Sequence, residues 1–320
     1  MVGRPIARIR GEMSTDRRMA WLDGRLVDWA DARIHVDTLA VQGGLNAYEV
    51  IGAFWSEVEH QLFLFRTDAH LERLAYSTRV MRLIVPYSPD EIVEAAAGLL
   101  RANALREDAG VRIVVYLGSG PLSVGGARGA EAGLFMIARP ASPELRRPRL
   151  HVGTSKWSRL SDTAAPPRVK AGANYHNARL AQLQARIDGY DDAVLLNSAG
   201  KVCELPLANL FLVRNGVLHT PSATSGILEG ITRRTVIESA PGIGLKVVER
   251  EVDRSELYAA EEVFATGTMS GITPVLSVDR YPVGTGNPGK ITSRLAALLD
   301  GLKRHLEPSP PAWCVPVYVE

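Results

Sequence analysis

The segment Arg168–Thr235 reads RVKAGANYHNARLAQLQARIDGYDDAVLLNSAGKVCELPLANLFLVRNGVLHTPSATSGILEGITRRT, and it combines three features that need one another. Lys170 lies in a Gly- and Ala-rich stretch at a strand-to-helix boundary, with no acidic residue close in sequence. Glu204 follows 34 residues later (204 − 170 = 34), inside an otherwise apolar strand. Gly230–Arg233 then opens a helix, whose first N–H groups and threonine hydroxyl can bind an anion.

Each of these features also has an ordinary interpretation when it is taken alone. Lys170 is one of 37 basic residues, most of which belong on the surface. An acid in an apolar strand usually points outward from a sheet edge, and Thr232 resembles the polar residues that cap helices. Only their occurrence together indicates a site.

The composition excludes several classes of protein. The chain has 320 residues, which favours about two domains, and its 37 basic and 35 acidic residues give a net charge of +2. Such a balance gives no reason to expect nucleic-acid or membrane binding. Cys203 and Cys314 are too few for a disulfide framework or a four-ligand zinc site. Since no secretory signal or membrane-length apolar run is present, we expect a cytoplasmic protein.

The order of predicted elements suggests two domains between a mobile N-terminal tail and a C-terminal tail. Both halves mix strands with helices, which favours an α+β or α/β architecture for each. The stretch 139–149 is rich in Pro and Arg, as linkers often are. The predicted division is a tail over 1–18, a small domain over 19–138, a linker over 139–149, a large domain over 150–306 and a C-terminal tail over 307–320.

Four local patterns predict elements in the first half. Asp23-Gly24 favours a tight hairpin turn between two short strands, and Gln61–Phe65 is strand-like. A helix with apolar residues at helical spacing follows, with Thr67 or Asp68 as its expected cap. Ser88–Glu91 is a capping box that opens a helix running to about Leu105.

The remaining elements follow from short apolar runs. Two more strands are expected in the first half, and the final helix covers about residues 291–306. The strands expected after the helix that ends near Leu105 are Val111–Leu117, Gly133–Ala138, Asp192–Leu196, Leu210–Val213, Leu245–Glu249, Glu262–Ala265 and Pro274–Val278.

Other common catalytic motifs are absent from the sequence. Gly118-Ser-Gly120 lacks the third glycine of a dinucleotide-binding loop, and no Walker lysine follows it. The seven histidines show no spacing typical of metal ligands. A Gly-x-Ser-x-Gly motif is also missing. The chemistry therefore rests on the Lys170–Thr232 region.

With these motifs the chain resembles the class IV aminotransferases, which are pyridoxal-phosphate enzymes of fold type IV. Among them it is most similar to the branched-chain amino acid aminotransferases. The resemblance covers about 260 residues in one order and spacing. The matching stretches are Trp21–Gly24, Ile34–Val36, Phe65-Arg66, His70–Arg73, Lys170–Tyr175, Glu204, Asn209–Phe211, Gly230–Arg233, Gly267-Thr268 and Ile272–Pro274. It implies a small α/β domain, a larger barrel-like domain and a homodimer with its pocket at the subunit interface.

The resemblance also implies a role for individual residues. Lys170 would bind the cofactor covalently and then act as acid and base. Glu204 would pair with the pyridine nitrogen, Tyr175 would hydrogen-bond the ring's phenolic oxygen, and Leu228 would pack on the ring. The cofactor phosphate would be held by Arg66, Ile231, Thr232 and Thr268. The turn that ends at Met269 would offer N–H groups to the substrate carboxylate.

Departures from the family pattern concern the substrate pocket. Branched-chain enzymes normally carry a tyrosine where this chain has Gly43, and a glycine and an arginine where Val50 and Gly52 stand. Tyr48-Glu-Val50 instead resembles D-amino acid and some (R)-selective amine aminotransferases. Those D-specific enzymes use an Arg-x-His motif where this chain has Leu122-Ser-Val124, so a D-amino acid would lack its carboxylate partner.

We therefore expect a transaminase that passes an amino group between an amino acid and a 2-oxo acid in two half-reactions. Arg112 aligns with the glutamate-binding arginine of the branched-chain family, which favours L-amino acids with glutamate as donor, although an exposed structural arginine is the alternative. D-amino acids or (R)-amines remain the other substrates. A lyase resembling aminodeoxychorismate lyase is the second hypothesis, and a non-catalytic cofactor-binding protein is the third.

Overall fold

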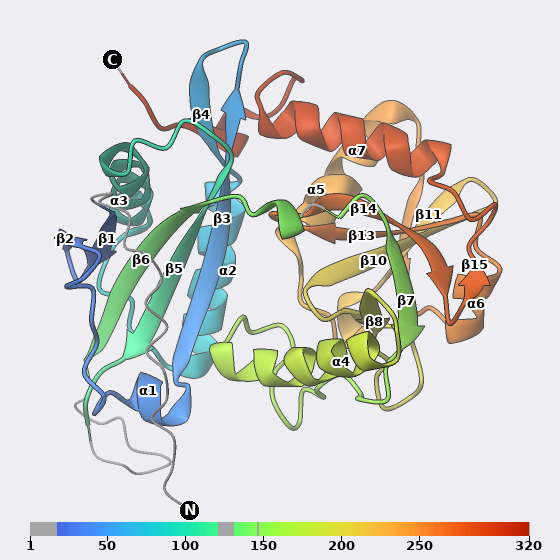
Figure 1. Cartoon of the computed structure of the whole chain (residues 1–320), viewed down its shortest axis with the longest axis horizontal. Coiled ribbons are helices and arrows are strands. Elements are labelled where there is room, and N and C mark those ends of the chain that lie inside the picture. Colours follow the sequence, from blue (N-terminus) through green and yellow to red (C-terminus); the bar gives the residue numbers. More distant parts are fainter. Residues whose placement is uncertain (1–17, 121–130, 146, 320) are drawn as a thin grey trace, which may run out of the picture.

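The computed structural model describes residues 18–120, 131–145 and 147–319. Two β-sheets lie side by side, each covered by helices (Figure 1). The predicted N-terminal tail and the Leu122–Val124 stretch lie outside the described residues, apart from Arg18. Within the described part, no helix is long and apolar enough to cross a membrane, and no cluster of His, Cys, Asp or Glu could hold a metal ion.

The first sheet is antiparallel throughout and has seven strands in the order β16-β4-β3-β5-β6-β1-β2. Helices α2 and α3 pack on one face, where their leucines and alanines meet alternate residues of β3 and β5. The elements are β1 Met19–Leu22, β2 Arg25–Asp28, α1 Leu39–Gly43, β3 Asn46–Ser56, β4 Gln61–Phe65, α2 Thr67–Met81, α3 Pro89–Ala102, β5 Ala109–Leu117, β6 Ala132–Pro140 and β16 Cys314–Pro316.

Local sequence signals explain how these elements begin. Asp23 and Gly24 both adopt positive φ angles (45° and 95°), as the tight turn between β1 and β2 requires. The Ser88 side chain accepts from the Glu91 N–H, and Glu91 reaches back to the Ser88 N–H, which confirms the capping box. The prediction for the cap of α2 was wrong, because Arg66, in the left-handed conformation, occupies the cap position.

The second sheet has nine strands and mixes parallel and antiparallel pairs. Apolar residues from β7, β8, β10 and β13 share one core, so the sheet curls in the barrel-like manner expected. Helices α5 and α7 cover the outer face of β10 and β13. The elements are β7 Leu150–Thr154, α4 Tyr175–Ile187, β8 Asp192–Val194, β9 Glu204–Leu205, β10 Ala208–Arg214, β11 Val217–Pro221, α5 Ile231–Ser239, β12 Val247–Arg250, α6 Arg254–Tyr258, β13 Glu262–Gly267, β14 Gly271–Val278, β15 Tyr281–Pro282 and α7 Lys290–Lys303. Short 3-10 turns cover Pro143–Leu145, Gly172–Asn174, Ala223–Ser225, Ala240–Ile243 and Pro311–Trp313.

The C-terminal segment returns to the first sheet. Cys314–Pro316, within the stretch expected to be a tail, pairs with β4 as strand β16. Leu299 and Leu302 of α7 pack on Phe54 and Phe63, which joins the second half of the chain to β3 and β4. The chain end is therefore part of the contact between the two halves.

A backbone contact places Lys170 at the junction of the two sheets. The Tyr48 N–H donates to the Lys170 carbonyl (2.9 Å), and Ala47 forms a bridge with Ala171. The Lys170 N–H donates to Ser77 Oγ on α2 (3.1 Å). The segment before α4 thus runs alongside the first residues of β3, and the lysine side chain emerges between the halves.

Candidate active site

One cavity collects most of the residues that the sequence singled out. It opens between the Lys170 segment, β9, the N-terminus of α5 and the end of β13. Its lining residues are Arg73, Arg159, Pro167, Val169, Lys170, Asn174, Tyr175, Ala178, Glu204, Leu205, Pro206, Leu207, Ala208, Asn209, Leu228, Gly230, Ile231, Thr232, Thr266, Gly267 and Thr268. The three features of the Arg168–Thr235 segment therefore meet in space.

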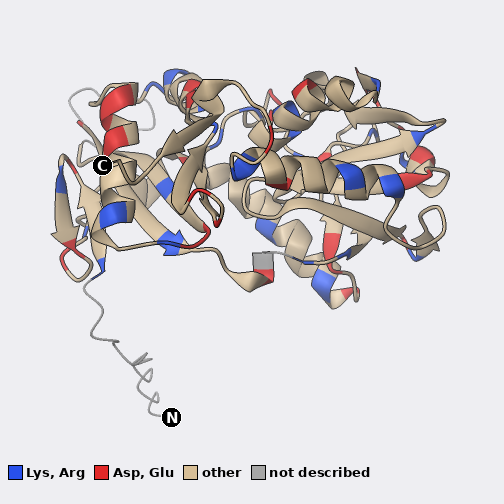
Figure 2. Cartoon of the chain, turned by 90° about the horizontal axis from the view of Figure 1, so that it is seen from above, with Lys and Arg blue, Asp and Glu red and all other residues tan. Residues whose placement is uncertain are grey.

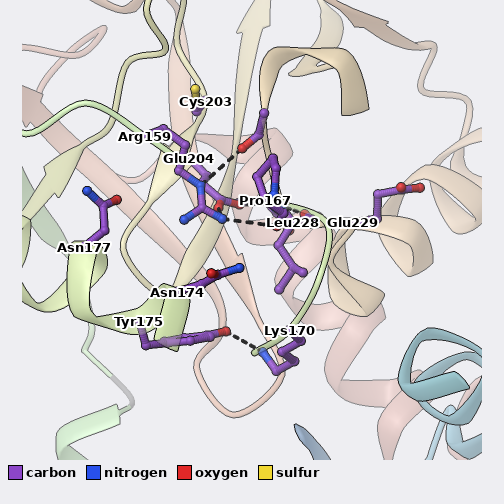
Figure 3. Close-up of polar contacts among 12 residues, drawn as sticks. Arg159, Pro167, Lys170, Asn174, Tyr175, Asn177, Cys203, Glu204, Leu228 and Glu229 are labelled. Atoms are coloured by element: carbon purple, nitrogen blue, oxygen red, sulfur yellow. Dashed lines mark hydrogen bonds and ion pairs between the residues drawn. The ribbon is translucent and has the colours of Figure 1, made fainter. Parts of the chain in front are cut away.

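Lys170 and Tyr175 form a hydrogen-bonded pair in this cavity. Lys170 Nζ donates to the Tyr175 hydroxyl at 2.7 Å (Figure 3). Lys170 Nζ also lies 5.0 Å from the ring centroid of Tyr48 and 5.2 Å from that of Tyr175, within the distance range of a cation–π interaction. Burial and the neighbouring Tyr175 raise the pKa of Tyr48 far above its ordinary value, so Tyr48 is neutral.

Glu204 is a buried carboxylate with three donors. Its Oε2 accepts from Asn209 Nδ2 (2.9 Å) and from the Leu228 N–H (3.0 Å). Its Oε1 forms an ion pair with Arg159 Nη2 at 2.9 Å, and each of the two side chains is 7% exposed. Burial raises the pKa of Glu204 to about 7, although Arg159 and the Leu228 N–H oppose this rise.

The N-terminus of α5 is available to an anion. Gly230 is its cap residue, no side chain caps the first turn, and no acid lies within that turn. The N–H groups at such a helix end need a partner and favour negative charge. A Cβ at residue 230 would stand 1.9 Å from Asn209 Oδ1, so glycine is required there. The prediction that Gly230–Arg233 opens a helix is confirmed.

Arg73 brings a cation to the same end of the cavity. Its Nη1 donates to the Glu229 carbonyl at 2.7 Å, directly before the α5 cap. Its Nε and Nη2 bind both oxygens of Glu49 (2.7 and 2.8 Å), and His70 Nδ1 lies 2.8 Å from Glu49 Oε2. Burial opposes the charge on Glu49, but Arg73 and His70 hold its pKa well below the ordinary value. Burial lowers the pKa of His70, so this side chain is neutral.

The structure does not bring Arg66 to the cavity. Its Nη1 instead donates to Thr235 Oγ1 (3.1 Å) and Glu238 (2.7 Å), on the side of α5 away from its first turn. The guanidinium also stacks over Trp313 at 4.2 Å. Arg66 is the cap residue of α2 and its side chain is buried against α5 and Trp313, whereas Arg73 lies two turns further along α2. Arg73 therefore replaces Arg66 as the candidate phosphate-binding arginine.

The predicted substrate residues lie on the sheet beside the cavity. Val50 and Arg112 are register partners on β3 and β5, and the Arg112 guanidinium stacks on the Tyr48 ring at 4.4 Å. The Tyr48 ring therefore contacts both Arg112 and Lys170. Met269 lies near Gly110, where a Cβ would approach its sulfur to 3.2 Å. Gly43 is exposed at the end of α1, away from these contacts.

The residues present fit pyridoxal 5′-phosphate. The phosphate would meet the uncapped start of α5, the Arg73 guanidinium and the hydroxyls of Thr232 and Thr268. The pyridine nitrogen requires an acidic partner, and a lysine must reach the aldehyde carbon. Glu204 and Lys170 supply these groups from the walls of the same cavity.

Two arginines of the cavity, Arg73 and Arg159, had no role in the sequence interpretation. Arg73 lies in the matching stretch His70–Arg73, and this match was the sequence signal that could have indicated it. In the structure it lies on the side of α2 that faces the cavity. Arg159 lies 45 residues before Glu204 (204 − 159 = 45), in a loop without regular structure after β7. Nothing in its local sequence marks it.

Comparisons with known proteins agree with this site. The family model described as amino-transferase class IV matches residues 46–278. A probable branched-chain-amino-acid aminotransferase of Aquifex aeolicus is 35% identical over 93% of this chain and 96% of its own. The branched-chain amino acid aminotransferase of Thermobaculum terrenum, solved in its PLP form, has 36% identity and a TM-score of 0.90, covering 96% of this chain and 100% of that one.

A third relative was solved with an adduct of cofactor and amino acid. This T.th. branched-chain amino acid aminotransferase is in complex with N-(5′-phosphopyridoxyl)-L-glutamate. It is 32% identical, with a TM-score of 0.89 over 94% of this chain and 98% of that one. Both the matched length and the level of identity establish the family. The chain belongs to the class IV aminotransferases and is a pyridoxal-phosphate-dependent enzyme that transfers an amino group between an amino acid and a 2-oxo acid.

Proposed function

We propose that this enzyme uses Lys170 as its catalytic residue and takes L-glutamate as amino donor. The observation that carries the catalytic assignment is the 2.7 Å contact between Lys170 Nζ and the Tyr175 hydroxyl, in a cavity that also holds the Glu204 carboxylate and the start of α5. A lysine amine, an acid and an anion-binding helix end are the three groups that this cofactor needs.

The cofactor and three side chains would each have a separate role in proton transfer. Bound pyridoxal phosphate supplies an electron sink for the charge that develops when the substrate loses its Cα proton. Lys170 Nζ would take that proton, and the Tyr175 hydroxyl would keep the amine in place. Leu228 would exclude water from the ring face.

Cofactor retention would depend on the opposite ends of the cavity. Glu204 would accept a hydrogen bond from the ring nitrogen. At the other end, the N–H groups of Ile231 and Thr232 and the hydroxyl of Thr268 would bind the phosphate with Arg73. These groups would thereby keep the cofactor in the cavity throughout the reaction.

The substrate proposal rests on Arg112 and on the relative that carries the glutamate adduct. That protein was solved with a phosphopyridoxyl derivative of L-glutamate. In this chain, Arg112 lies on the same face of the sheet as Tyr48 and Val50, at the side of the cavity where Lys170 emerges. An arginine there would bind the side-chain carboxylate of glutamate or 2-oxoglutarate, and Tyr48 and Val50 would contact apolar substrates.

Replacing Arg112 tests this assignment. We expect Arg112→Gln to raise the KM for L-glutamate about 10- to 100-fold. This is the change in affinity that the loss of one hydrogen bond to a charged group produces. The KM for an apolar monocarboxylic donor such as L-leucine should change less than about twofold, because it has no second carboxylate. Arg106→Gln is the matched control, since Arg106 also stacks on a tyrosine, Tyr318, at 4.5 Å. Equal KM changes for both donors would contradict the role.

Replacing Arg73 tests the phosphate site. We expect Arg73→Lys to weaken the affinity for pyridoxal phosphate about 10- to 100-fold, because lysine keeps the charge but loses the forked geometry. Arg66→Lys is the matched control, and its affinity should stay within about twofold of the wild type. Equilibrium titration with the cofactor measures both. If the Arg66 variant lost affinity and the Arg73 variant did not, Arg66 would be the phosphate-binding arginine after all.

The relatives favour transamination over the alternatives, and one assay separates them. Purified enzyme is given L-glutamate, D-glutamate or a primary (R)-amine with a branched 2-oxo acid, and the new amino acid is quantified. We expect product with L-glutamate and at least about tenfold less with the other two donors. Pyruvate release from aminodeoxychorismate without an acceptor would instead indicate a lyase.

We further propose a cytoplasmic homodimer in which residues 19–138 and 150–306 form the two domains. The two described cysteines are free and buried, as in proteins of reducing compartments. Figure 2 shows basic and acidic residues interspersed over both halves, in keeping with the net charge of +2. Sedimentation velocity would give the mass of two chains. Full activity in a monomer would contradict the dimer.

A further inference from the structure

Arg159 contacts the acid of the active site and the backbone of two neighbouring segments. Its Nη2 forms the 2.9 Å ion pair with Glu204 Oε1 and also donates to the Pro167 carbonyl at 3.3 Å (Figure 3). Its Nε donates to the Gly226 carbonyl at 3.2 Å. Pro167 precedes Lys170 by three residues, and Gly226 precedes Leu228 by two. One guanidinium thus ties Glu204 to the segments that carry the lysine and the ring-contacting leucine.

The hydrogen bonds of Glu204 leave room for one more donor. A carboxylate has about four acceptor positions, two on each oxygen. Among the described residues, Asn209 and the Leu228 N–H occupy Oε2, and Arg159 occupies one position on Oε1. The remaining position on Oε1 is available to a donor in the cavity. The cofactor's ring nitrogen is such a donor only when it carries a proton.

We propose that Arg159 is a positioning residue that keeps the Glu204 carboxylate ionised and fixed, so that the ring nitrogen of the cofactor retains its proton. This inference rests on the proposed function insofar as Glu204 pairs with that nitrogen. Without Arg159, the buried carboxylate would take up a proton itself. The neutral acid would then accept a weaker hydrogen bond from a protonated ring nitrogen than the carboxylate does.

The electrostatic surroundings support this role. Burial raises the pKa of Glu204 to about 7, and Arg159 gives the largest opposing effect, ahead of the Leu228 N–H, Lys170 and Arg73. The neighbouring Cys203 thiol is neutral, since burial raises its pKa to about 12. Lys170 and Arg73 act from other walls of the cavity, whereas Arg159 is in direct contact with the carboxylate. Removing Arg159 would therefore raise the pKa of Glu204 further.

The test compares cofactor affinity across pH for wild type, Arg159→Gln and Arg159→Lys. In the wild type, affinity should reach its plateau once Glu204 is ionised. In Arg159→Gln, the acidic limb of the plot of cofactor affinity against pH should shift to higher pH by about one unit or more. Cofactor affinity at pH 7 should fall about tenfold or more. Arg159→Lys should recover part of the shift because it restores a cation. An unshifted acidic limb in Arg159→Gln overturns the proposal.

A second background keeps the test independent of folding defects. Arg159→Gln leaves a buried carboxylate without its ion-pair partner, so the single variant should have a lowered Tm. In Glu204→Gln protein that charge is absent, and adding Arg159→Gln should lower cofactor affinity by less than about twofold. Equal losses in both backgrounds would show that Arg159 acts independently of Glu204 and would overturn the inference.

The matched control is another arginine in a partly buried ion pair. Arg304 Nη2 lies 2.9 Å from Asp108, and its Nη1 donates to the Trp55 carbonyl, outside the cavity. Arg304→Gln should lower the Tm without moving the pH dependence of cofactor affinity. A wild-type protein that does not bind the cofactor would refute the proposed function itself, whereas normal binding with unshifted Arg159 variants refutes only this inference.

Discussion

The variant Lys170→Ala is expected to lose transaminase activity by about 10⁴-fold or more. Lys170 would both bind the cofactor and transfer the proton, and a positioned acid–base group alone contributes up to about 10⁴-fold. The cofactor should still bind, more weakly, because the α5 N-terminus and Arg73 remain. Single-turnover measurements with excess L-glutamate and added pyridoxal phosphate give the rate.

Lys201→Ala is the matched control for this variant. Lys201 is a lysine in an ion pair with Asp253 at 2.7 Å, and it does not line the cavity. Its activity should remain within about twofold of wild type. Added methylamine should restore part of the lost activity to Lys170→Ala, since it supplies an amine to the vacated space. Retention of more than about one-tenth of the wild-type rate in Lys170→Ala would contradict the assigned role.

The second large effect is expected for Glu204→Gln, with a loss of about 10²-fold or more in the half-reaction rate. A neutral amide cannot hold a proton on the ring nitrogen, and removing one such electrostatic partner from an active site typically costs about 10²- to 10³-fold. Glu238→Gln is the matched control, because Glu238 pairs with Arg66 and Arg234 outside the cavity. A rate for Glu204→Gln within about threefold of wild type would exclude the proposed pairing.

The same variant makes a separate prediction for stability without cofactor. The pKa of Glu204 is about 7 in the folded chain and near its ordinary value of 4.5 when unfolded, because burial favours the neutral acid. Ionising Glu204 therefore destabilises the folded state as pH rises from about 4.5 to 7, and the penalty persists above that range. Cofactor-free Glu204→Gln should have a higher Tm than wild type at about pH 8 and a similar Tm at about pH 4.5.

Local signals predicted most elements of the fold from the sequence. The Asp23-Gly24 turn and the Ser88–Glu91 capping box each depend on residues within four positions of one another. The interactions that form them can therefore be predicted from the local sequence alone. The path of Cys314–Pro316 could not be predicted in this way. Its pairing with β4 joins residues about 250 positions apart, and the surrounding prolines are more typical of a loop.

The site shows the same difference between local and distant causes. The start of α5 was predicted because its glycine and threonine lie at the helix end itself. Arg66 and Arg73 are both arginines of one short segment, and only the direction of α2 relative to α5 distinguishes them. Arg159 reaches Glu204 from an irregular loop, so no periodicity or motif indicates the contact.

The most direct test of the central claim is the near-visible absorption spectrum of the purified enzyme, before and after L-glutamate is added alone. We expect the band of the lysine-bound cofactor at first, and its replacement by the band of the amino form of the cofactor after glutamate is added. That exchange would show both the cofactor and the first half-reaction with an L-amino acid. A cofactor band that L-glutamate leaves unchanged, but that D-glutamate or an (R)-amine converts, would contradict the proposed donor. The absence of any cofactor band after reconstitution with pyridoxal phosphate would contradict the site.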